Sequence, residues 1–139
     1  MKDNNCIFCK IANGEFSSYT LYEDEDFRVI FDINPATKGH ALVLPKEHYK
    51  NLFELDDETA AKALVVAKKV ATALSNELGC DGFNLLQNNG ELAGQTVFHF
   101  HIHLIPRYKD DSFSFSTSHG KIDEEEAANL AKKISESLK

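Results

Sequence analysis

Three of the six histidines in this sequence lie within five residues, in the stretch VFHFHIHLIPR. His99, His101 and His103 occupy alternate positions, with apolar residues between them. Imidazole has an ordinary pKa of about 6.5, so it exchanges protons near neutral pH, and its unprotonated nitrogen is a nucleophile or a metal ligand. The spacing therefore indicates a histidine site, whose chemistry depends on how neighbouring elements position the three rings.

A strand over Val97–Ile105 would place the three histidines on one face and the apolar residues Phe98, Phe100, Ile102 and Leu104 on the other. Successive imidazoles would then be about 6–7 Å apart at Cα. The outer pair is too far apart for all three rings to reach one metal ion at about 2.0–2.1 Å. A nucleophilic histidine with neighbours that orient it and exchange protons is the better interpretation, and phosphorus is a suitable target.

The loop before this strand, Asn88–Gln95, is polar and contains glycine. It offers neutral donors and backbone amides of the kind that hold phosphate oxygens. An ordinary hairpin loop is the alternative interpretation, but the adjacent histidines favour a phosphate site. The candidate phosphate ligands are Asn88, Gly94, Gln95 and Thr96.

Short strands and two helices are predicted around this site. Strands are predicted at Thr20–Glu23, Phe27–Phe31, Gly39–Leu44, Gly82–Gln87 and Val97–Ile105. A long helix is predicted from Asp56 or Asp57 to a stop at Gly79, with a buried stripe of Leu64, Ala67, Ala71, Leu74 and Leu78. A second helix is predicted over Asp123–Leu138. This order is typical of an α+β fold with a largely antiparallel sheet.

Length and composition set limits on the class of protein. A chain of 139 residues with 42% hydrophobic residues fits one domain, 1–139, with a buried core. The net charge of −7 argues against binding along nucleic acid or an anionic membrane. The polar start and the lack of a membrane-length apolar run favour a cytoplasmic protein, in which the three cysteines are reduced.

The stretch QTVFHFHIHLIPR resembles the signature of the histidine triad (HIT) superfamily. FDINPATKGHALVLPKEH, at Phe31–His48, is similar to the ribose-binding region of that family, and CIFCKI to its N-terminal segment. The likeness covers about Cys6 to Tyr108 and resembles the Hint-like branch. It implies a homodimeric HIT fold with a five-stranded, mainly antiparallel sheet, one long central helix and a C-terminal helix. The core would span about 6–108 and a C-terminal extension 109–139.

The resemblance also implies roles for individual residues. His101 would attack the α-phosphorus of a purine nucleotide conjugate, with His99 beside it and His103 donating to the phosphate or the leaving group. Asp32 would bind the ribose hydroxyls and Ile33 the base, while His40 would have a supporting role. Without the family, Asp32 beside Asn34-Pro35 would be interpreted as a turn residue.

The implied activity is hydrolysis of adenosine phosphoramidates with release of AMP, through a covalent nucleotidyl-histidine. Two alternatives stay open at this point. One is dinucleoside polyphosphate hydrolysis, and the other is a nucleotide-binding regulator with little turnover.

Cys6 and Cys9 form a C-x-x-C pair, which alone could be redox-active, half of a metal site or two buried thiols. His48 and His99 are the candidates to complete a zinc site, although their spacing does not show that the four converge. The resemblance implies that they do, because part of the family carries a structural zinc at these positions. A closed site of two cysteines and two histidines would brace the fold without activating water.

Overall fold

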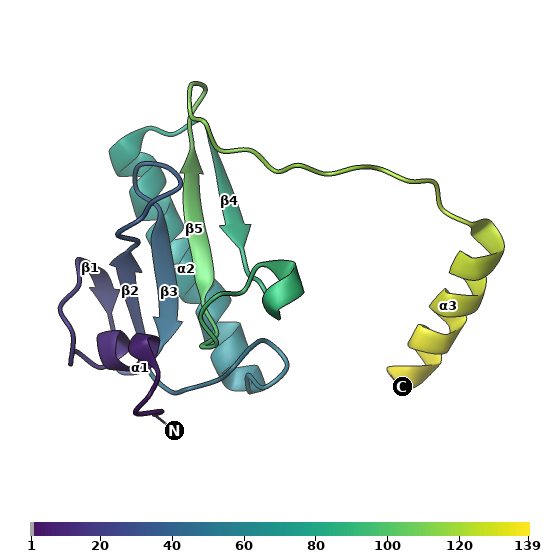
Figure 1. Cartoon of the computed structure of the whole chain (residues 1–139), viewed down its shortest axis with the longest axis horizontal. Helices are drawn as coiled ribbons and strands as arrows, with labels where there is room; N and C mark the ends of the chain where they lie inside the picture. Colours follow the sequence, from purple (N-terminus) through teal and green to yellow (C-terminus); the bar gives the residue numbers. More distant parts are fainter. Residues whose placement is uncertain (1) are drawn as a thin grey trace.

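A five-stranded antiparallel sheet lies at the centre of the structure, a computed structural model that describes residues 2–139. Along the sheet the strands follow the order β1-β2-β3-β5-β4 (Figure 1). Their bounds are β1 Thr20–Glu23, β2 Phe27–Phe31, β3 Ala41–Pro45, β4 Gly82–Leu86 and β5 Ile102–Arg107. The helices are α1 Ile7–Ala12, α2 Asp57–Leu78 and α3 Glu124–Ser137, with a short 3₁₀ helix, η1, at Glu91–Ala93. The predicted α+β class is confirmed.

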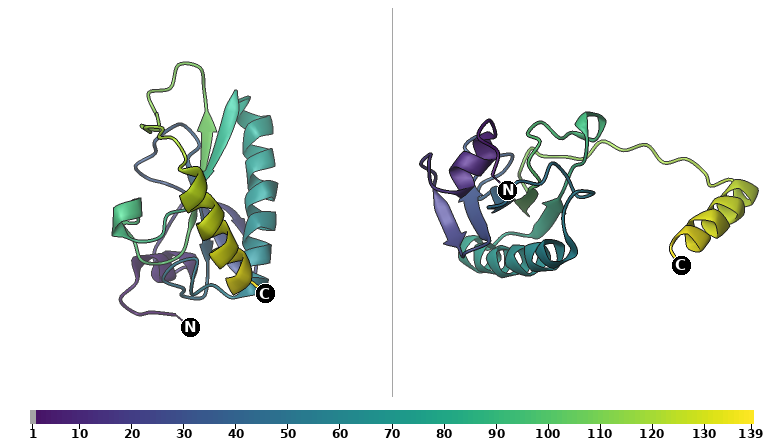
Figure 2. Two further views of the ribbon diagram at one scale, coloured as in Figure 1. Left: turned by 90° about the vertical axis from the view of Figure 1, so that its right-hand side faces the viewer. Right: turned by 90° about the horizontal axis from the view of Figure 1, so that it is seen from below.

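The two faces of the sheet are covered by different helices, α2 on one side and α1 on the other (Figure 2). Successive side chains of β3 point to opposite faces of the sheet. Ala41 and Val43 pack in the cluster that contains α2, whereas Leu42 and Leu44 pack in the smaller cluster beside α1. Because both faces are covered, β3 is a continuous apolar run with no polar positions.

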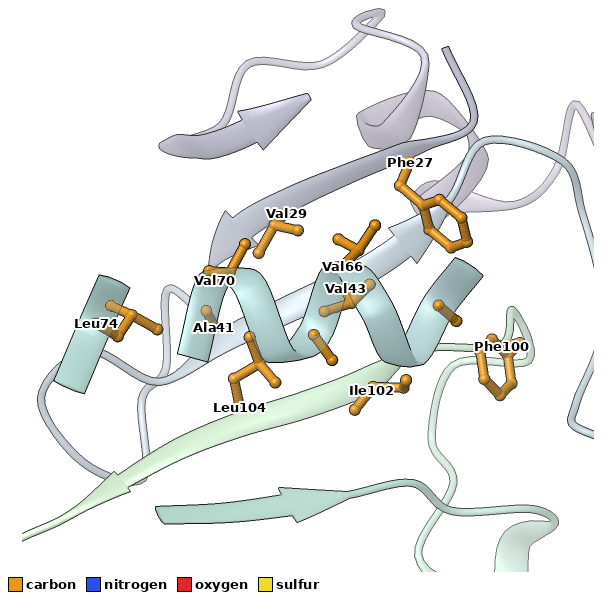
Figure 3. Close-up of a cluster of buried hydrophobic side chains, with 12 residues drawn as sticks. Phe27, Val29, Ala41, Val43, Val66, Val70, Leu74, Phe100, Ile102 and Leu104 are labelled. Carbon is orange, nitrogen blue, oxygen red and sulfur yellow. The ribbon is translucent and has the colours of Figure 1, made fainter. Parts of the chain in front are cut away.

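The larger core cluster lies between α2 and the sheet (Figure 3). Strands β2, β3 and β5 each point apolar side chains at α2, and the residues before β5 add Phe100. Ile102 and Leu104 of β5 belong to this cluster, so His103 between them points to the opposite face, toward α1. The core thereby determines the side of the sheet on which the histidines lie.

Helix α2 begins and ends as predicted. The Asp56 carboxylate accepts a hydrogen bond from the Thr59 backbone N–H (2.7 Å), and Gly79 ends the helix with a left-handed φ of 62°. The predicted buried stripe is correct only in part, because Ala67 and Leu74 are buried but Leu64 is 61% exposed. The helix offers apolar residues on more than one side. The sheet packs against the side that carries Ala63, Val66, Ala67, Val70 and Leu74.

The prediction of a strand over Val97–Ile105 is wrong at its start, because β5 begins only at Ile102. The ladder with β3 ends at the pair Val43–Ile102, two residues before Pro45. Pro45 has no N–H to donate, and its carbonyl oxygen lies 2.8 Å from Nε2 of the His99 ring. His99 and His101 therefore lie on a bent segment before the strand. Phe98, predicted to be in the core, is 42% exposed there.

The chain after β5 leaves the sheet. Residues 109–123 contain no helix or strand, and α3 follows at Glu124–Ser137, close to its predicted bounds. No residue of α3 is buried. Among residues 2–139, no helix is long and apolar enough to cross a membrane.

We expect Leu104→Ala to lower the free energy of unfolding by about 2–5 kcal/mol, because Leu104 is fully buried between the sheet and α2 and the truncation leaves a cavity. Leu52→Ala is the matched control, since Leu52 is 45% exposed in a loop. Its expected change is within about 0.5 kcal/mol. Urea denaturation followed by circular dichroism measures both, and equal losses would contradict this description of the core.

Candidate active site and metal centre

His101 and His103 line a cavity of about 410 Å³ on the α1 side of the sheet. Its walls also include residues of α1, the chain around Asp32, Ser17 with Ser18, Leu42 of β3, and Thr96 with Val97. The sequence-predicted residues that meet in this cavity are Asp32, Ile33, Thr96, His101 and His103. The structure thus brings two histidines, a carboxylate and apolar walls into one cavity.

The protonation pattern of His101 follows from its hydrogen bond. Its Nδ1 lies 2.7 Å from the backbone carbonyl oxygen of His99. A carbonyl oxygen only accepts, so Nδ1 carries the proton and Nε2 is left with a free lone pair. Burial lowers the pKa of His101 below the ordinary value of imidazole, with the His99 carbonyl acting in the opposite direction. The neutral ring that results has the nucleophilic form near neutral pH.

His40 and His103 form a second ordered pair. The backbone N–H of Ala36 donates to Nδ1 of His40 (3.0 Å), so the proton of the neutral His40 ring is on Nε2. Nε2 of His40 lies 2.9 Å from Nδ1 of His103, which therefore accepts. The proton of His103 must then be on Nε2, where it is available to a ligand. Burial, together with the neighbouring His101 and His40, lowers the pKa of His103 to about 4.

Asp32 makes a turn contact and also lines the cavity. Its Oδ1 accepts from the backbone N–H of Asn34 (2.8 Å), which is a turn contact. Its Oδ2 lies 3.7 Å from Nε2 of His40. The Asp32 backbone N–H donates to the His40 carbonyl (2.9 Å), and Thr37 Oγ1 donates to the Pro106 carbonyl (2.6 Å), so the loop is held against β5.

Asp32, His40 and His103 place three possible ligand atoms within 4.8 Å of one another, but their hydrogen bonds do not fit a metal ion. Nδ1 of His40 already accepts from Ala36, so Nε2 must keep its proton while the ring is neutral. Metal binding through that atom would require an anionic ring. His40 and His103 instead form a chain of hydrogen bonds that starts at the Ala36 N–H and leaves the Nε2 proton of His103 for the cavity.

The candidate phosphate ligands of the preceding loop are placed differently from one another. Thr96 lines the cavity. The side chain of Gln95 is 2% exposed and fully engaged, since Oε1 accepts from Gly90 N–H and Nε2 donates to the carbonyls of Lys50 and Val97. Gln95 therefore holds the shape of the loop. Asn88 and Gly94 lie beside each other outside the cavity walls, and Gly94 has a left-handed φ of 98°.

Arg107 and Lys46, the two cations near the strand ends, bind carboxylates outside the cavity. Arg107 binds Asp111 through Nε and Nη2 at 3.0 and 3.1 Å, which lowers the pKa of Asp111 to about 2. Lys46 binds Glu23 at 2.7 Å. Neither side chain lines the cavity.

Cys6, Cys9, His48 and His99 converge, and their four ligand atoms lie within 4.8 Å of one another. The Nδ1 atom of His99 lies 3.3 Å from Sγ of Cys6 and 3.4 Å from Sγ of Cys9. The Nδ1 atom of His48 lies 3.4 Å from Sγ of Cys9. Ligands of a tetrahedral zinc ion are about 3.3–3.8 Å from one another, so the arrangement fits that ion.

The hydrogen bonds around this cluster also fit a metal. The carbonyl of Pro45 accepts from Nε2 of His99, which leaves the Nδ1 lone pair directed at the thiols. Without a cation, burial raises the pKa of Cys9 to about 11, and a metal ion would supply the charge that favours the thiolate. Asn13 Nδ2 donates to the carbonyls of Cys9 and Lys46, which ties α1 to the end of β3.

His99 connects the two sites. Its ring faces Cys6 and Cys9, while its backbone carbonyl accepts the Nδ1 proton of His101. A group that fixes the His99 ring therefore also fixes the His99 carbonyl oxygen, which accepts the Nδ1 proton of His101. The two sites are therefore one continuous structure.

Helix α1 is a functional element that the sequence did not predict. It carries Cys9 and the cavity residues Phe8 and Ile11, and the Phe8 ring meets the His101 ring edge-on at 5.0 Å. At six residues it is too short for a periodic signal. The available clue was Cys6, whose sulfur caps the helix by accepting from the Cys9 N–H (3.3 Å).

Residues 13–110 match the HIT domain family. The chain belongs to this family. The crystal structure of SMU.412c from Streptococcus mutans UA159 superposes with a TM-score of 0.94 at 42% identity, covering 99% of this chain and 88% of that one. The Schizosaccharomyces pombe protein named adenosine 5'-monophosphoramidase hnt1 is 40% identical over 136 residues, 97% of this chain and 99% of its own.

A third relative bears on the metal centre. A zinc-bound histidine triad protein from Mycobacterium smegmatis superposes with a TM-score of 0.75 at 39% identity, covering 96% of this chain and 95% of that one. With these relatives, the HIT protein described here is a nucleotide hydrolase of the HIT type, and the HIT fold predicted from the sequence is confirmed.

We expect the His103 ring of the native HIT protein to titrate near pH 4, because burial disfavours its charged form. In the unfolded chain the same ring takes up a proton near pH 6.5, so its contribution to stability is lost as the pH falls from about 6.5 to 4. Proton NMR of the ring measures the native midpoint, and the protein in concentrated urea is the control. A native midpoint at or above 6.5 would contradict the buried pair.

Proposed function

We propose that this HIT protein hydrolyses adenosine phosphoramidates to AMP through a covalent intermediate on His101. The observation that carries the proposal is the 2.7 Å hydrogen bond from His101 Nδ1 to the His99 carbonyl. It leaves the Nε2 lone pair free in a cavity that also contains the Asp32 carboxylate. A phosphoramidase among the relatives supports the choice of substrate.

The first half-reaction forms a bond between His101 Nε2 and the α-phosphorus. The bond from phosphorus to the leaving nitrogen breaks, and the nitrogen departs as an amine with the electron pair and one proton. The phosphorylated ring is cationic, and its Nδ1–H donates more strongly to the His99 carbonyl. The Nε2 proton of His103 would stabilise the charge on a phosphate oxygen or the leaving group.

The second half-reaction returns the enzyme to its starting state. Water attacks the same phosphorus and the bond to His101 breaks, so AMP is formed and one proton is released. This balances the proton that the leaving amine carried away. Splitting the displacement into two steps is ordinary covalent catalysis, and His101 is regenerated with its lone pair free.

The remaining candidate residues receive binding roles in this proposal. The Oδ2 atom of Asp32 accepts from the ribose hydroxyls, and Ile33, 81% exposed at the cavity, packs on the base. Thr96 donates to a phosphate oxygen from the cavity wall. Gly94 and Asn88 act through the loop that Gln95 holds in shape, so the contribution of Gln95 is to position the loop.

We further propose that Cys6, Cys9, His48 and His99 hold one structural zinc ion per chain. The supporting observations are the 3.3–3.4 Å spacing of the sulfur and nitrogen atoms and the zinc-bound relative. All four positions of a tetrahedral site would be filled by protein, so the ion braces the N-terminal segment against β3. The reacting phosphorus would be held by other residues.

A two-fold homodimer is the assembly that we propose for this chain. β4 lies at an edge of the sheet with one side unpaired among the described residues, and Leu85 on it is 46% exposed. Leu64 of α2, which lines the same surface pocket as Leu85, is 61% exposed. Pairing β4 with β4 of a second copy would satisfy the unpaired backbone groups of the strand and cover the exposed apolar side chains beside it. This combination favours self-association.

His101→Gly tests the nucleophile. We expect kcat for adenosine phosphoramidate to fall by at least about 10⁴-fold, while AMP binding stays measurable by calorimetry, because only the attacking atom is lost. His119→Ala is the matched control, since His119 lies in the exposed segment after β5. Retention of wild-type turnover by His101→Gly would contradict the mechanism.

The wild-type reaction separates the alternatives. AMP binding without turnover of any phosphoramidate would favour a regulatory nucleotide-binding protein. Preferential cleavage of a dinucleoside polyphosphate would favour that substrate class and keep the same role for His101. Quenched mass spectrometry with labelled substrate locates the adduct, and a label on another residue would refute the proposal.

Cys9→Ser tests the metal. We expect the zinc content per chain to fall sharply, and kcat to fall in part, because the His99 carbonyl is less firmly held. Cys80→Ser is the control, because Cys80 lies outside the cluster of metal ligands. Its thiol bonds only Ser75 Oγ (3.6 Å) in the described chain. Complete loss of activity with an intact fold would instead indicate a catalytic metal.

A further inference from the structure

Cys6 and Cys9 are two thiols whose own reactivity the proposed hydrolysis does not use. Their sulfur atoms lie within 4.8 Å of each other, and both contact Nδ1 of His99, at 3.3 and 3.4 Å. The Cys9 backbone N–H also donates to Sγ of Cys6 (3.3 Å), which holds the first sulfur next to the residue that carries the second. A disulfide with its S–S bond of about 2.05 Å therefore requires movement only within segment 6–9.

The two thiols differ in their access to solvent. Cys6 lines a surface cavity of about 530 Å³, whose other walls include His48 and Phe98. Cys9 does not line this cavity, and it is only 2% exposed. A hydroperoxide is a small, neutral molecule, so it can enter such a cavity without unfolding of α1. A dissolved oxidant thus meets the sulfur of Cys6 first, and the nearest thiol to react with the product is Cys9.

The third cysteine does not have this arrangement. Cys80 follows the end of α2, and among the described residues its thiol bonds only the Ser75 hydroxyl, at 3.6 Å. An oxidised Cys80 would have no neighbouring thiol in the described chain with which to form a disulfide. Cys80 therefore serves as an internal control for the reactivity of the pair.

We propose that Cys6 and Cys9 form an oxidation site, at which a hydroperoxide converts the two thiols into a disulfide. The Cys6 thiolate attacks one oxygen of hydrogen peroxide and the O–O bond breaks. Cys6 becomes a sulfenic acid, and the departing hydroxide takes up a proton to form water. The Cys9 thiolate then attacks the Cys6 sulfur, the S–O bond breaks, and this hydroxide also becomes water. The two sulfurs lose two electrons, which reduce the peroxide to two molecules of water.

The disulfide has a consequence for the two sites that His99 connects. It would leave His48 and His99 as the remaining ligands of the proposed zinc site, whereas a structural zinc ion needs four. This consequence rests on the proposed zinc site, but the disulfide itself does not. The His99 ring would lose its thiolate partners while its carbonyl holds the Nδ1 proton of His101. Oxidation at Cys6 would therefore act on the nucleophile through the backbone of His99.

Peroxide titration of the full-length protein, purified with zinc, tests the site. After quenching with catalase, the free thiols are alkylated in denaturant, and the intact mass is measured without reductant. We expect three alkyl groups on the reduced chain and one, on Cys80, on the oxidised chain. A peptide map should show the link between Cys6 and Cys9, and dithiothreitol should reverse it. Oxidation of Cys80 with both other thiols still alkylated would overturn the proposal.

Two variants separate the attacking thiol from the resolving thiol. In Cys9→Ser the sulfenic acid of Cys6 should persist and be trapped by dimedone. In Cys6→Ser the buried Cys9 should be oxidised at least about tenfold more slowly than the wild-type pair. Cys80→Ser is the matched control and should form the disulfide at the wild-type rate. A dimedone adduct on Cys9 instead of Cys6 would overturn the assigned order, and the wild-type peptide map stands if either variant misfolds.

Zinc release and turnover measure the consequence of oxidation. A chromogenic chelator should detect one zinc ion for each disulfide formed, and kcat for the phosphoramidate should fall about tenfold. Dithiothreitol with added zinc should restore both. A disulfide formed without zinc release would refute the proposed zinc site and leave the oxidation site supported. The disulfide is measured without substrate, so its result is independent of whether His101 forms the proposed adduct.

Discussion

The hydrogen bond from His101 Nδ1 to the His99 carbonyl is the contact on which the rest of the site depends. It fixes the proton on one nitrogen and leaves the other free, without any acidic partner for the ring. A backbone acceptor is neutral, so it orients the imidazole without raising its pKa as strongly as a carboxylate would. Burial favours the neutral form of the ring, and the carbonyl could stabilise the cationic ring of the proposed covalent intermediate.

The carbonyl of His99 is well placed because its own ring is fixed on both sides. Nε2 of His99 is bound to Pro45, and Nδ1 faces the two thiols. The ladder between β3 and β5 ends at the pair Val43–Ile102, and the chain before it bends at His99, whose ring binds the Pro45 carbonyl. The cluster of two cysteines and two histidines, the end of β3 and the proposed nucleophile thus form one hydrogen-bonded unit.

A second line of hydrogen bonds ends at His103, the other histidine of the cavity. It runs from Ala36 through His40 to His103 and presents an N–H near the free lone pair of His101. The two histidines of the cavity therefore have complementary roles, one as a lone pair and one as a donor. Strand alternation alone gives them the same face, while their different hydrogen-bond partners give them different chemistry.

The sequence alone determined the class of fold, the helix from Asp56 to Gly79 and the histidine cluster, because periodicity, capping and residue type are local properties. Tertiary structure decided what depends on distant partners. In the folded chain β5 begins only at Ile102, Leu64 is exposed, and Gln95 holds the shape of its loop. Cys6 also lies beside His99, which is 93 residues away in the sequence. Local sequence patterns do not predict these features, because each depends on contacts between residues that are far apart in the sequence.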